Sequence, residues 1–213
     1  METGETLAAA RREYTRAGLS EEDLTASPLE LFDRWYAEAA ALLEPNAMVV
    51  ATTSADGQPS ARMVLLKGVS DEGFVFFTNL ASRKGEDLAA NPRAALLFPW
   101  HPLERQVRIE GTVETLTDAE VAAYFATRPR SSQLGAWASH QSRPVTGRDE
   151  LEAAYREAED MFGGAEVTVP PEWGGYRVRP ETIEFWQGRS SRMHDRLVYV
   201  REGDGWRTLR LAP

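Results

Sequence analysis

The run Arg192-Met193-His194-Asp195-Arg196 places three basic side chains at every second residue. A β-strand points alternate side chains to opposite faces, so Arg192, His194 and Arg196 are predicted to share one face. Such cations repel one another unless an anion lies between them. Arg offers phosphate or carboxylate a planar pair of donors, and His exchanges a proton near neutral pH. The run therefore indicates an anion site, and the alternative is an exposed edge strand with scattered basic residues.

A second cationic cluster, Arg83 and Lys84, follows directly after Ser82. Ser82 is predicted to cap a short helix that ends near Asn91, before Pro92. The N–H groups of a helix N-terminus and two adjacent cations are typical of a phosphate site. Bases in a first helical turn cost roughly 0.3–1 kcal/mol each, so their presence indicates a ligand. The alternative is a capped helix with two exposed bases.

A third set, Tyr124, Arg128 and Ser132, is spaced by four residues and can share one helical face. Arg and hydroxyl groups again suit a phosphate. Lys67 ends the apolar stretch that begins at Arg62, where it is either an exposed residue or a charge at the mouth of a barrel. Two separate phosphate sets predict an enzyme that joins a phosphorylated cofactor to a phosphorylated substrate.

The composition excludes several classes of protein. The chain has 213 residues, 42% of them hydrophobic, and a formal net charge of -9, which disfavours nucleic acid and acidic membranes as partners. It has no Cys, and its three His are far apart, so no metal site is expected. No apolar run approaches the ~20 residues that span a bilayer, and no signal peptide is recognisable. We expect a cytoplasmic protein.

The elements that must position these residues are mostly strands, joined by short turns that favour antiparallel pairing. A closed or nearly closed barrel would bury their edges. The predicted fold class is therefore mainly β with peripheral helices (α+β). Strands are expected at residues 47–54, 59–69, 74–78, 94–100, 104–115, 176–178, 182–186, 192–201 and 206–211, and helices at 6–17, 27–45, 82–91, 117–128 and 147–162. Ser27 is the predicted N-cap of the second helix, and Thr117 with Glu120 is predicted to form a capping box at the start of the fourth.

Blocks along the whole chain carry a resemblance to a known family. They are Arg62–Lys67, Phe76–Asn79, Ser82–Lys84, Phe98–Trp100, Leu103–Val107, Tyr124-Phe125, Arg128–Arg130, Gly135–Trp137, Trp173–Gly175, Glu184–Gly188, Arg192–Arg196 and Arg210–Pro213. Together they resemble the pyridoxine/pyridoxamine 5'-phosphate oxidase family, and the resemblance extends from Arg11 to Pro213.

The resemblance implies a single FMN-binding split β-barrel domain at residues 27–213, in a homodimer with active sites at the subunit interface. It implies oxidation of pyridoxine 5'-phosphate or pyridoxamine 5'-phosphate by O2 to pyridoxal 5'-phosphate, with release of H2O2 and, from the amine, NH3. Residues 1–26 are then a helical segment that acts as a mobile lid, because Arg11 to Tyr14 resembles a family segment that closes over bound substrate.

The resemblance also assigns a role to individual residues. Arg192 and His194 are the implied catalytic residues. The implied FMN contacts are Arg62, Met63, Val64, Leu65, Phe77, Thr78, Arg83, Lys84, Gln106, Gln141, Ser142, Trp186 and Arg196. The implied substrate contacts are Arg11, Tyr14, Lys67, Tyr124, Arg128, Ser132, Arg192, Met193 and His194. From the sequence pattern alone, Gln106 reads as an exposed strand residue, and Gln141 and Ser142 are uninformative.

Three residues depart from the pattern of some relatives. Phe77 stands where these have Tyr, Met193 replaces a commoner Leu, and Glu44 replaces an Asp. Two alternatives remain open at this stage. One is a split-barrel flavin oxidoreductase with another substrate, such as a phenazine-type oxidase or a flavin reductase. The other is a non-catalytic protein that stores pyridoxal 5'-phosphate.

Overall fold

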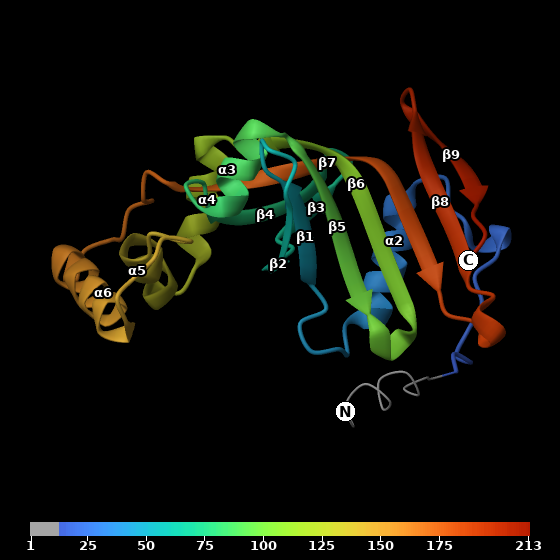
Figure 1. Cartoon of the computed structure of the whole chain (residues 1–213), viewed down its shortest axis with the longest axis horizontal. Helices are drawn as coiled ribbons and strands as arrows, with labels where there is room; N and C mark the ends of the chain where they lie inside the picture. The colour runs from blue at the N-terminus through green and yellow to red at the C-terminus, as the bar shows by residue number, and fades with distance from the viewer. Residues whose placement is uncertain (1–12) are drawn as a thin grey trace. The chain divides into compact units, whose positions relative to one another are not determined.

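The computed structural model describes residues 13–213, which form two compact units (Figure 1). In the described part, unit 1 consists of residues 13–45, Leu97–Ile109 and Glu181–Pro213, and unit 2 of Asn46–Leu96 and Glu110–Pro180. Residues 1–12, which include Arg11, lie outside the described part. The assignment of residues 27–213 to a single domain stays a prediction.

The described residues form one sheet of nine strands, in the order β2-β1-β5-β6-β7-β4-β3, with β8 paired to β7 and β9 to β8. The registered pairs β1–β2, β3–β4, β4–β7, β7–β8 and β8–β9 are antiparallel, which confirms the predicted mode of pairing. The strands are β1 (Ala47–Thr53), β2 (Pro59–Leu65), β3 (Gly68–Ser70), β4 (Gly73–Asn79), β5 (Arg93–Trp100), β6 (Arg105–Thr115), β7 (Trp173–Gln187), β8 (Asp195–Glu202) and β9 (Gly205–Arg210).

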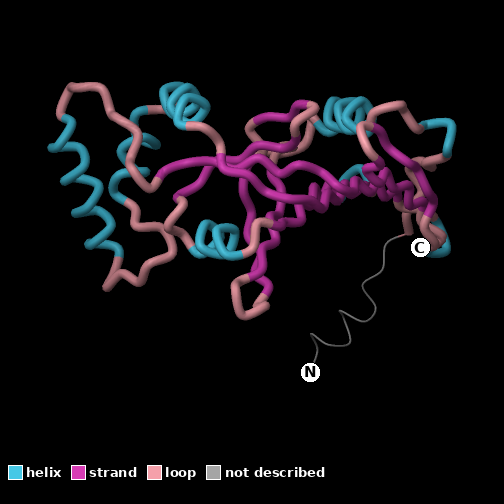
Figure 2. Tube along the Cα trace, turned by 90° about the horizontal axis from the view of Figure 1, so that it is seen from above, coloured by secondary structure: helices cyan, strands magenta, loops and turns pink. Residues whose placement is uncertain are grey.

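The helices of the described part are drawn in cyan in Figure 2. They are α2 (Pro28–Ala39), α3 (Arg83–Ala90), α4 (Asp118–Thr127), α5 (Arg130–Ala138) and α6 (Arg148–Phe162), with 3-10 turns η1 (Glu21–Asp23), η2 (His101–Leu103) and η3 (Ser190–Arg192). Helix α5 was not predicted as a separate element, because Pro129 precedes it and no polar cap marks its start.

Helix α2 provides much of the core of unit 1 (Figure 1). Its N-cap is Ser27, whose side chain accepts the Leu29 N–H group, as the sequence predicts. The apolar stripe of α2 faces the sheet, with the Phe32 ring 5.1 Å from Phe98 and the Trp35 ring 5.2 Å from Phe185. Burial of these rings holds α2 against the strands.

Unit 2 has its own core between α4, α5, α6 and the strands, which includes Phe125, Leu134 and Trp173. The capping box predicted at Thr117 and Glu120 opens α4. Helices α5 and α6 lie side by side (Figures 1 and 2), and the Trp137 and Phe162 rings of these helices are 5.3 Å apart.

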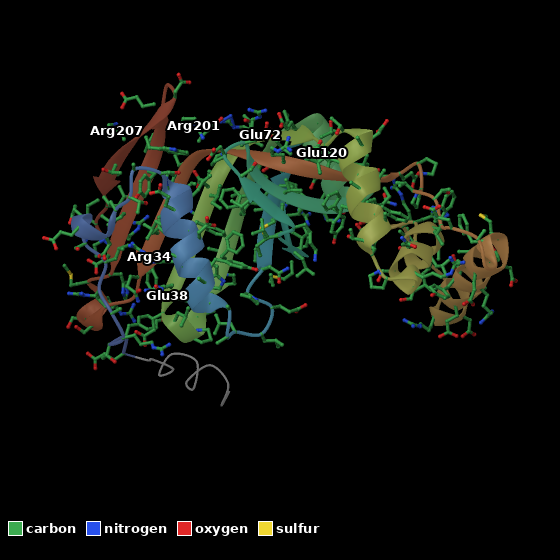
Figure 3. All side chains as sticks on the ribbon, turned by 180° about the vertical axis from the view of Figure 1, so that it is seen from behind. Arg34, Glu38, Glu72, Glu120, Arg201 and Arg207 are labelled. Atoms are coloured by element: carbon green, nitrogen blue, oxygen red, sulfur yellow. The ribbon has the colours of Figure 1, made fainter. Side chains whose placement is uncertain are left out.

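A cluster of ion pairs fixes α4 to β6 and β7 at the surface of unit 2. The Arg177 guanidinium lies 2.8 Å from Glu114 and 2.6 Å from Glu120. It also lies 3.2 Å from Glu72, which Figure 3 shows on the same side of the molecule as Glu120. The cluster therefore positions α4, which carries one of the predicted site residues, Tyr124.

The helix predicted at residues 6–17 is wrong for residues 13–17, which have no helical structure. Their amides bond to distant carboxylates instead. Glu104 accepts the N–H groups of Thr15 and Arg16 at 2.9 and 3.0 Å, and Asp195 accepts that of Leu19 at 3.0 Å. A side chain remote in sequence thus replaces the helical hydrogen bonds that local propensity favoured.

The strand predicted at residues 192–201 begins only at Asp195. Ser191 and Arg192 adopt left-handed backbone angles, with φ of 55° and 61°, which end the extended pattern. The prediction that Arg192 and His194 alternate along a strand with Arg196 is therefore wrong. No helix of the described residues is long and apolar enough to cross a membrane, and the cytoplasmic location stays a prediction.

Candidate functional site

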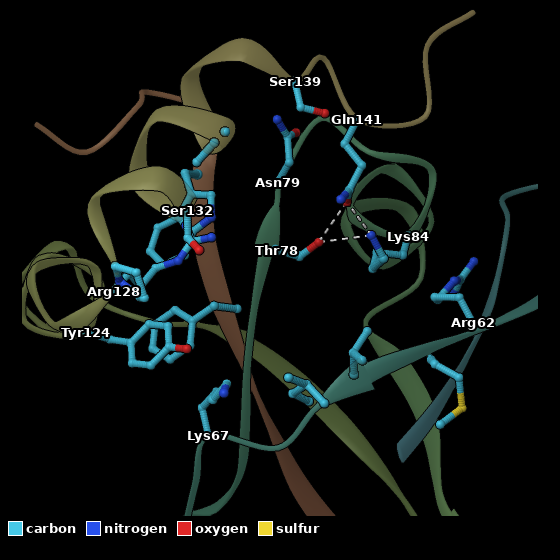
Figure 4. Close-up of a pocket in the computed structure, with 18 of the residues that line it drawn as sticks. Arg62, Lys67, Thr78, Asn79, Lys84, Tyr124, Arg128, Ser132, Ser139 and Gln141 are labelled. Carbon is cyan, nitrogen blue, oxygen red and sulfur yellow. Dashed lines mark hydrogen bonds between the residues drawn. The ribbon is translucent and has the colours of Figure 1, made fainter. Parts of the chain in front are cut away.

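Unit 2 contains a cavity of about 1020 Å³ (Figure 4). This volume is near the upper end of the roughly 300–1,000 Å³ that is usual for ligand and cofactor sites. Every residue that lines it belongs to unit 2. The predicted site residues among them are Arg62, Met63, Val64, Leu65, Lys67, Phe77, Thr78, Lys84, Tyr124, Arg128, Ser132 and Gln141.

Lys84 of α3 supplies a buried cation on one side of the cavity. Its Nζ donates to Gln141 Oε1 at 2.6 Å and to Thr78 Oγ1 at 2.9 Å (Figure 4). A third bond of 3.1 Å reaches Ser82 Oγ. All three partners are neutral, and burial, with a smaller effect from the charge of Arg62, lowers the pKa of Lys84 to about 8. A buried ammonium with neutral partners favours an anionic ligand.

Ser82 precedes α3 as predicted, but its side chain does not cap the helix. Its hydroxyl instead donates to the Asn79 carbonyl at 2.6 Å and accepts from Lys84. The serine thereby orients the Lys84 ammonium. Arg83, the first residue of α3, is exposed and does not line the cavity.

Arg62 reaches the cavity from β2, and a network of hydroxyl and carboxylate groups holds its guanidinium. Its guanidinium donates to Thr52 Oγ1 at 2.6 Å and to Ser60 Oγ at 2.5 Å. Both hydroxyls donate to Asp87 Oδ2, at 2.6 and 3.0 Å, and Asp87 is only 4% exposed. Asp87 of α3 therefore couples the strand with Arg62 to the helix with Lys84. Sequence reasoning missed it, because an acid inside a helix gives no signal of a distant partner.

Arg128 lies on the other side of the cavity (Figure 4). Its guanidinium stands 4.9 Å from the centre of the Trp173 ring and 5.6 Å from that of Phe125. Its Nη1 atom is buried and has no hydrogen-bond partner among the residues that the structure describes, and burial lowers the pKa of the guanidinium. An orphaned buried donor is costly unless a ligand accepts from it.

Parallel aromatic rings form a wall beside Arg128. The Tyr124 ring is stacked on Phe77 at 3.9 Å, and Phe77 is stacked on Trp173 at 5.4 Å. Lys67 Nζ lies 5.9 Å from the centre of the Tyr124 ring. Trp173 lines the cavity but was not predicted as a site residue, although it opens the Trp-Gly-Gly block. The wall suits a flat ring that carries an anionic group.

A second group of predicted residues lies in unit 1, around His194. The His194 ring is 4.7 Å from Trp186 and 5.7 Å from Tyr14. His194 Nδ1 accepts the Arg189 backbone N–H at 3.0 Å. Because Nδ1 is the acceptor, the proton of a neutral imidazole sits on Nε2. His194 is thus arranged to donate a hydrogen bond from Nε2.

The other predicted residues of unit 1 are placed differently. Arg196 binds Glu184 through Nε at 2.7 Å and Nη2 at 3.1 Å, and its Nη1 donates to the Ala212 carbonyl. Arg192 and Met193 are exposed, Met193 at 66%. Gln106 is half-buried, and in unit 2 Ser142 is exposed and outside the cavity lining.

Comparison with protein families gives two matches. A model described as pyridoxamine 5'-phosphate oxidase matches residues 37–162. A model described as the pyridoxine 5'-phosphate oxidase C-terminal dimerisation region matches residues 173–213, which include β7, β8 and β9.

Two curated relatives, both named pyridoxine/pyridoxamine 5'-phosphate oxidase, are similar over nearly the whole chain. The protein from a Nocardioides species is 62% identical, covering 97% of this chain and 98% of the relative. The protein from Rubrobacter xylanophilus is 61% identical, covering 97% and 96%.

Among solved structures, PhzG from Burkholderia lata, in complex with tetrahydrophenazine-1-carboxylic acid, has a TM-score of 0.85 and 34% identity over 92% of this chain and 98% of that chain. A pyridoxamine 5'-phosphate oxidase-related, FMN binding protein from Nostoc punctiforme has a TM-score of 0.71 and 14% identity, over 89% and 100%, which shows the fold alone. The predicted split-barrel fold is confirmed.

Proposed function

This chain belongs to the pyridoxamine 5'-phosphate oxidase family, and on that premise we propose that it oxidises pyridoxine 5'-phosphate and pyridoxamine 5'-phosphate to pyridoxal 5'-phosphate. When bound, FMN would supply the two-electron redox chemistry that links oxidation of the substrate to reduction of O2 to H2O2. The amine substrate also takes up water and releases NH3.

One observation carries this proposal: a single cavity has the buried Lys84 on one side and the half-buried Arg128 on the other, and neither is neutralised by a carboxylate in the described part of the chain. Two phosphorylated ligands would satisfy both. Lys84, Arg62 and Arg83 are proposed to hold the FMN phosphate. Lys67, Tyr124, Arg128 and Ser132 are proposed to hold the substrate phosphate, beside the aromatic wall.

We propose further that each active site of a homodimer combines residues of two subunits. The lining of the cavity is supplied by unit 2 alone, whereas Arg192, His194 and Trp186 belong to unit 1. Residues 173–213 match the dimerisation region of the family. The partner's His194 would then donate from Nε2 to the substrate ring, and the partner's Arg192 would stabilise negative charge that develops during oxidation. The partner's Arg196 and Gln106 would complete the flavin site.

The role of the protein in this reaction is mainly to position the two rings. Hydride transfer needs the reacting atoms about 3–3.5 Å apart, which fixed phosphate contacts at both ends would secure. Met63, Val64 and Leu65 of β2 would pack along the flavin, and Thr78 and Gln141 would orient Lys84 toward its phosphate.

A phenazine-type oxidase is the second candidate, and the similarity to PhzG favours it. The identity to PhzG is 34%, against 62% to a pyridoxine/pyridoxamine 5'-phosphate oxidase. The orphaned Arg128 donor beside Ser132 also suits a phosphate monoester. We therefore place this candidate second.

Anaerobic mixing of the FMN-loaded protein with pyridoxine 5'-phosphate tests the proposal. We expect the flavin absorbance to bleach and, after O2 is admitted, to recover with one H2O2 per pyridoxal 5'-phosphate formed. Bleaching by tetrahydrophenazine-1-carboxylic acid but not by pyridoxine 5'-phosphate would support the second candidate. A protein that takes up no FMN would support a non-catalytic binder.

The affinity for FMN should fall as the pH rises above about 8. Burial lowers the pKa of Lys84 to about 8, so below this pH its ammonium is already charged in the free protein. Above it, binding of the phosphate must first return a proton to Lys84, so the dissociation constant should rise up to about tenfold per pH unit. Fluorescence titration from about pH 6 to 10 measures this. A Lys84→Met variant should bind weakly with no such inflection; the same inflection in the variant would contradict the assignment.

A further inference from the structure

Glu104 is a buried carboxylate outside the cavity that the proposed chemistry does not use. It follows η2 and is 3% exposed. Its Oε2 accepts the N–H groups of both Thr15 and Arg16, at 2.9 and 3.0 Å. Hydrogen bonds to a buried carboxylate are charge-assisted and shielded from water, so they hold this backbone more firmly than neutral bonds would.

The backbone of Glu104 binds a second segment at the same time. Its carbonyl accepts the Gly188 N–H at 2.7 Å and the Gln187 side-chain amide at 3.2 Å. Gln187 and Gly188 lead directly into the turn that carries Arg192 and His194. One residue therefore fixes both the N-terminal segment and the base of the His194 loop.

Tyr14 is the point at which these two segments meet. A Cβ atom added at Gly188 would lie 2.7 Å from Tyr14 Cγ, so the tyrosine occupies the space above the glycine. The Tyr14 ring also meets Trp186 at 5.8 Å and His194 at 5.7 Å between ring centres. The position of Tyr14 follows from the backbone of residues 15 and 16, which Glu104 holds.

We propose that Glu104 is a positioning residue for substrate binding, which acts by fixing Tyr14 against Gly188 and His194. The inference rests on the proposed function, because Tyr14 is a proposed substrate contact. The far end of the segment has separate anchors: Asp195 accepts the Leu19 N–H, and Arg210 pairs with Glu21 at 2.8 Å. Loss of the Glu104 carboxylate should thus free Tyr14 and its neighbours while residues from Leu19 onward stay in place.

Limited proteolysis of the full chain tests the contact without reference to activity. We expect trypsin to cleave the Glu104→Ala variant after Arg16 about tenfold faster than the wild type, since both amide bonds are lost. Glu104→Gln keeps an uncharged acceptor and should fall between the two. Glu152→Gln, which removes a carboxylate from an exposed pair on α6, is the matched control and should match the wild type. Equal cleavage of Glu104→Ala and wild type would overturn the proposal.

A double-mutant cycle separates positioning from a merely structural role. Glu104→Ala and Tyr14→Ala should each raise the KM for pyridoxine 5'-phosphate about tenfold, and the double variant should be no worse than the worse single one. If instead the increases in KM of the two single variants multiply in the double variant, Glu104 does not act through Tyr14. Gly188→Ala, which displaces Tyr14 directly, should raise KM and cleavage in the same way and serves as the positive control. If Glu104→Ala does not fold, Glu104→Gln decides the matter, because cleavage and KM equal to those of the wild type would overturn the proposal.

The two proposals fail in different ways. If the wild type does not oxidise pyridoxine 5'-phosphate, the proposed function is wrong, and the cleavage of Glu104→Ala and Glu104→Gln still decides whether Glu104 holds the segment. If the wild type is active and the variants match it in cleavage and KM, only the role of Glu104 is wrong.

Discussion

Replacement of Arg128 with methionine should raise the KM for pyridoxine 5'-phosphate about 100-fold or more. Its guanidinium has a buried donor with no partner among residues 13–213, so a substrate phosphate would gain charge-assisted hydrogen bonds of about 1.5–3 kcal/mol each. Each 1.4 kcal/mol is a tenfold change in affinity. Steady-state kinetics of H2O2 release over a range of substrate concentrations measure the effect.

We expect the same substitution to weaken substrate binding without lowering the stability of the ligand-free protein. Because the Arg128 donor is unsatisfied without ligand, Arg128→Met should leave the Tm of the ligand-free protein unchanged or raise it. Arg130→Met is the matched control, since Arg130 binds the Ala165 carbonyl and does not line the cavity. A fall in Tm together with an unchanged KM would mean that Arg128 serves the fold and not the substrate.

Replacement of Arg192 with alanine should lower kcat by about 100- to 1000-fold, the usual cost of losing a group that stabilises charge in a transition state. FMN should remain bound, because Arg192 is exposed and lies outside the cavity that holds Lys84. Stopped-flow measurement of anaerobic flavin reduction isolates the affected step. The FMN content of the purified variant, measured from its absorbance, is the accompanying control.

Arg207→Ala provides the matched comparison for this loss of charge. Arg207 lies on β9 and forms an exposed pair with Glu202 at 3.8 Å (Figure 3), a kind of interaction that contributes little. In the Arg207→Ala variant, anaerobic reduction of the flavin by substrate should proceed at the wild-type rate. A normal reduction rate in Arg192→Ala would refute a catalytic role for Arg192.

The sequence predicts those site residues whose side-chain type indicates the kind of ligand that they bind. Lys84 and Arg128 are predicted phosphate ligands on the basis of charge, hydroxyl neighbours and spacing, and both line the cavity. The antiparallel strands followed from turn signals and alternation, and the capping box at Thr117 followed from a local motif. Local patterns therefore suffice where the interacting residues are close in sequence.

The predictions that were wrong or missing concern residues whose partners lie far away in the chain or whose backbone angles are unusual. Residues 13–17 are not helical, and Glu104, 89 positions from Thr15, accepts the amides of Thr15 and Arg16 instead. Arg192 leaves the strand pattern at φ of 61°, an angle that non-glycine residues seldom adopt and that no local motif announced. The support of Arg62 by Asp87 likewise joins a strand to a helix, through Ser60, which lies 27 positions before Asp87. These contacts appear only once the chain is folded.

Complementation between two inactive variants tests the central claim, that one subunit binds the phosphates of FMN and substrate and the other supplies Arg192. Arg128→Met and Arg192→Ala should each be nearly inactive at substrate concentrations near the wild-type KM. Unfolded together and refolded as a mixture, they should recover about a quarter of wild-type activity, because about half of the dimers are mixed and each mixed dimer has one intact site. Activity no higher than that of the separate variants, in a mixture shown to contain mixed dimers, would contradict a site shared between subunits.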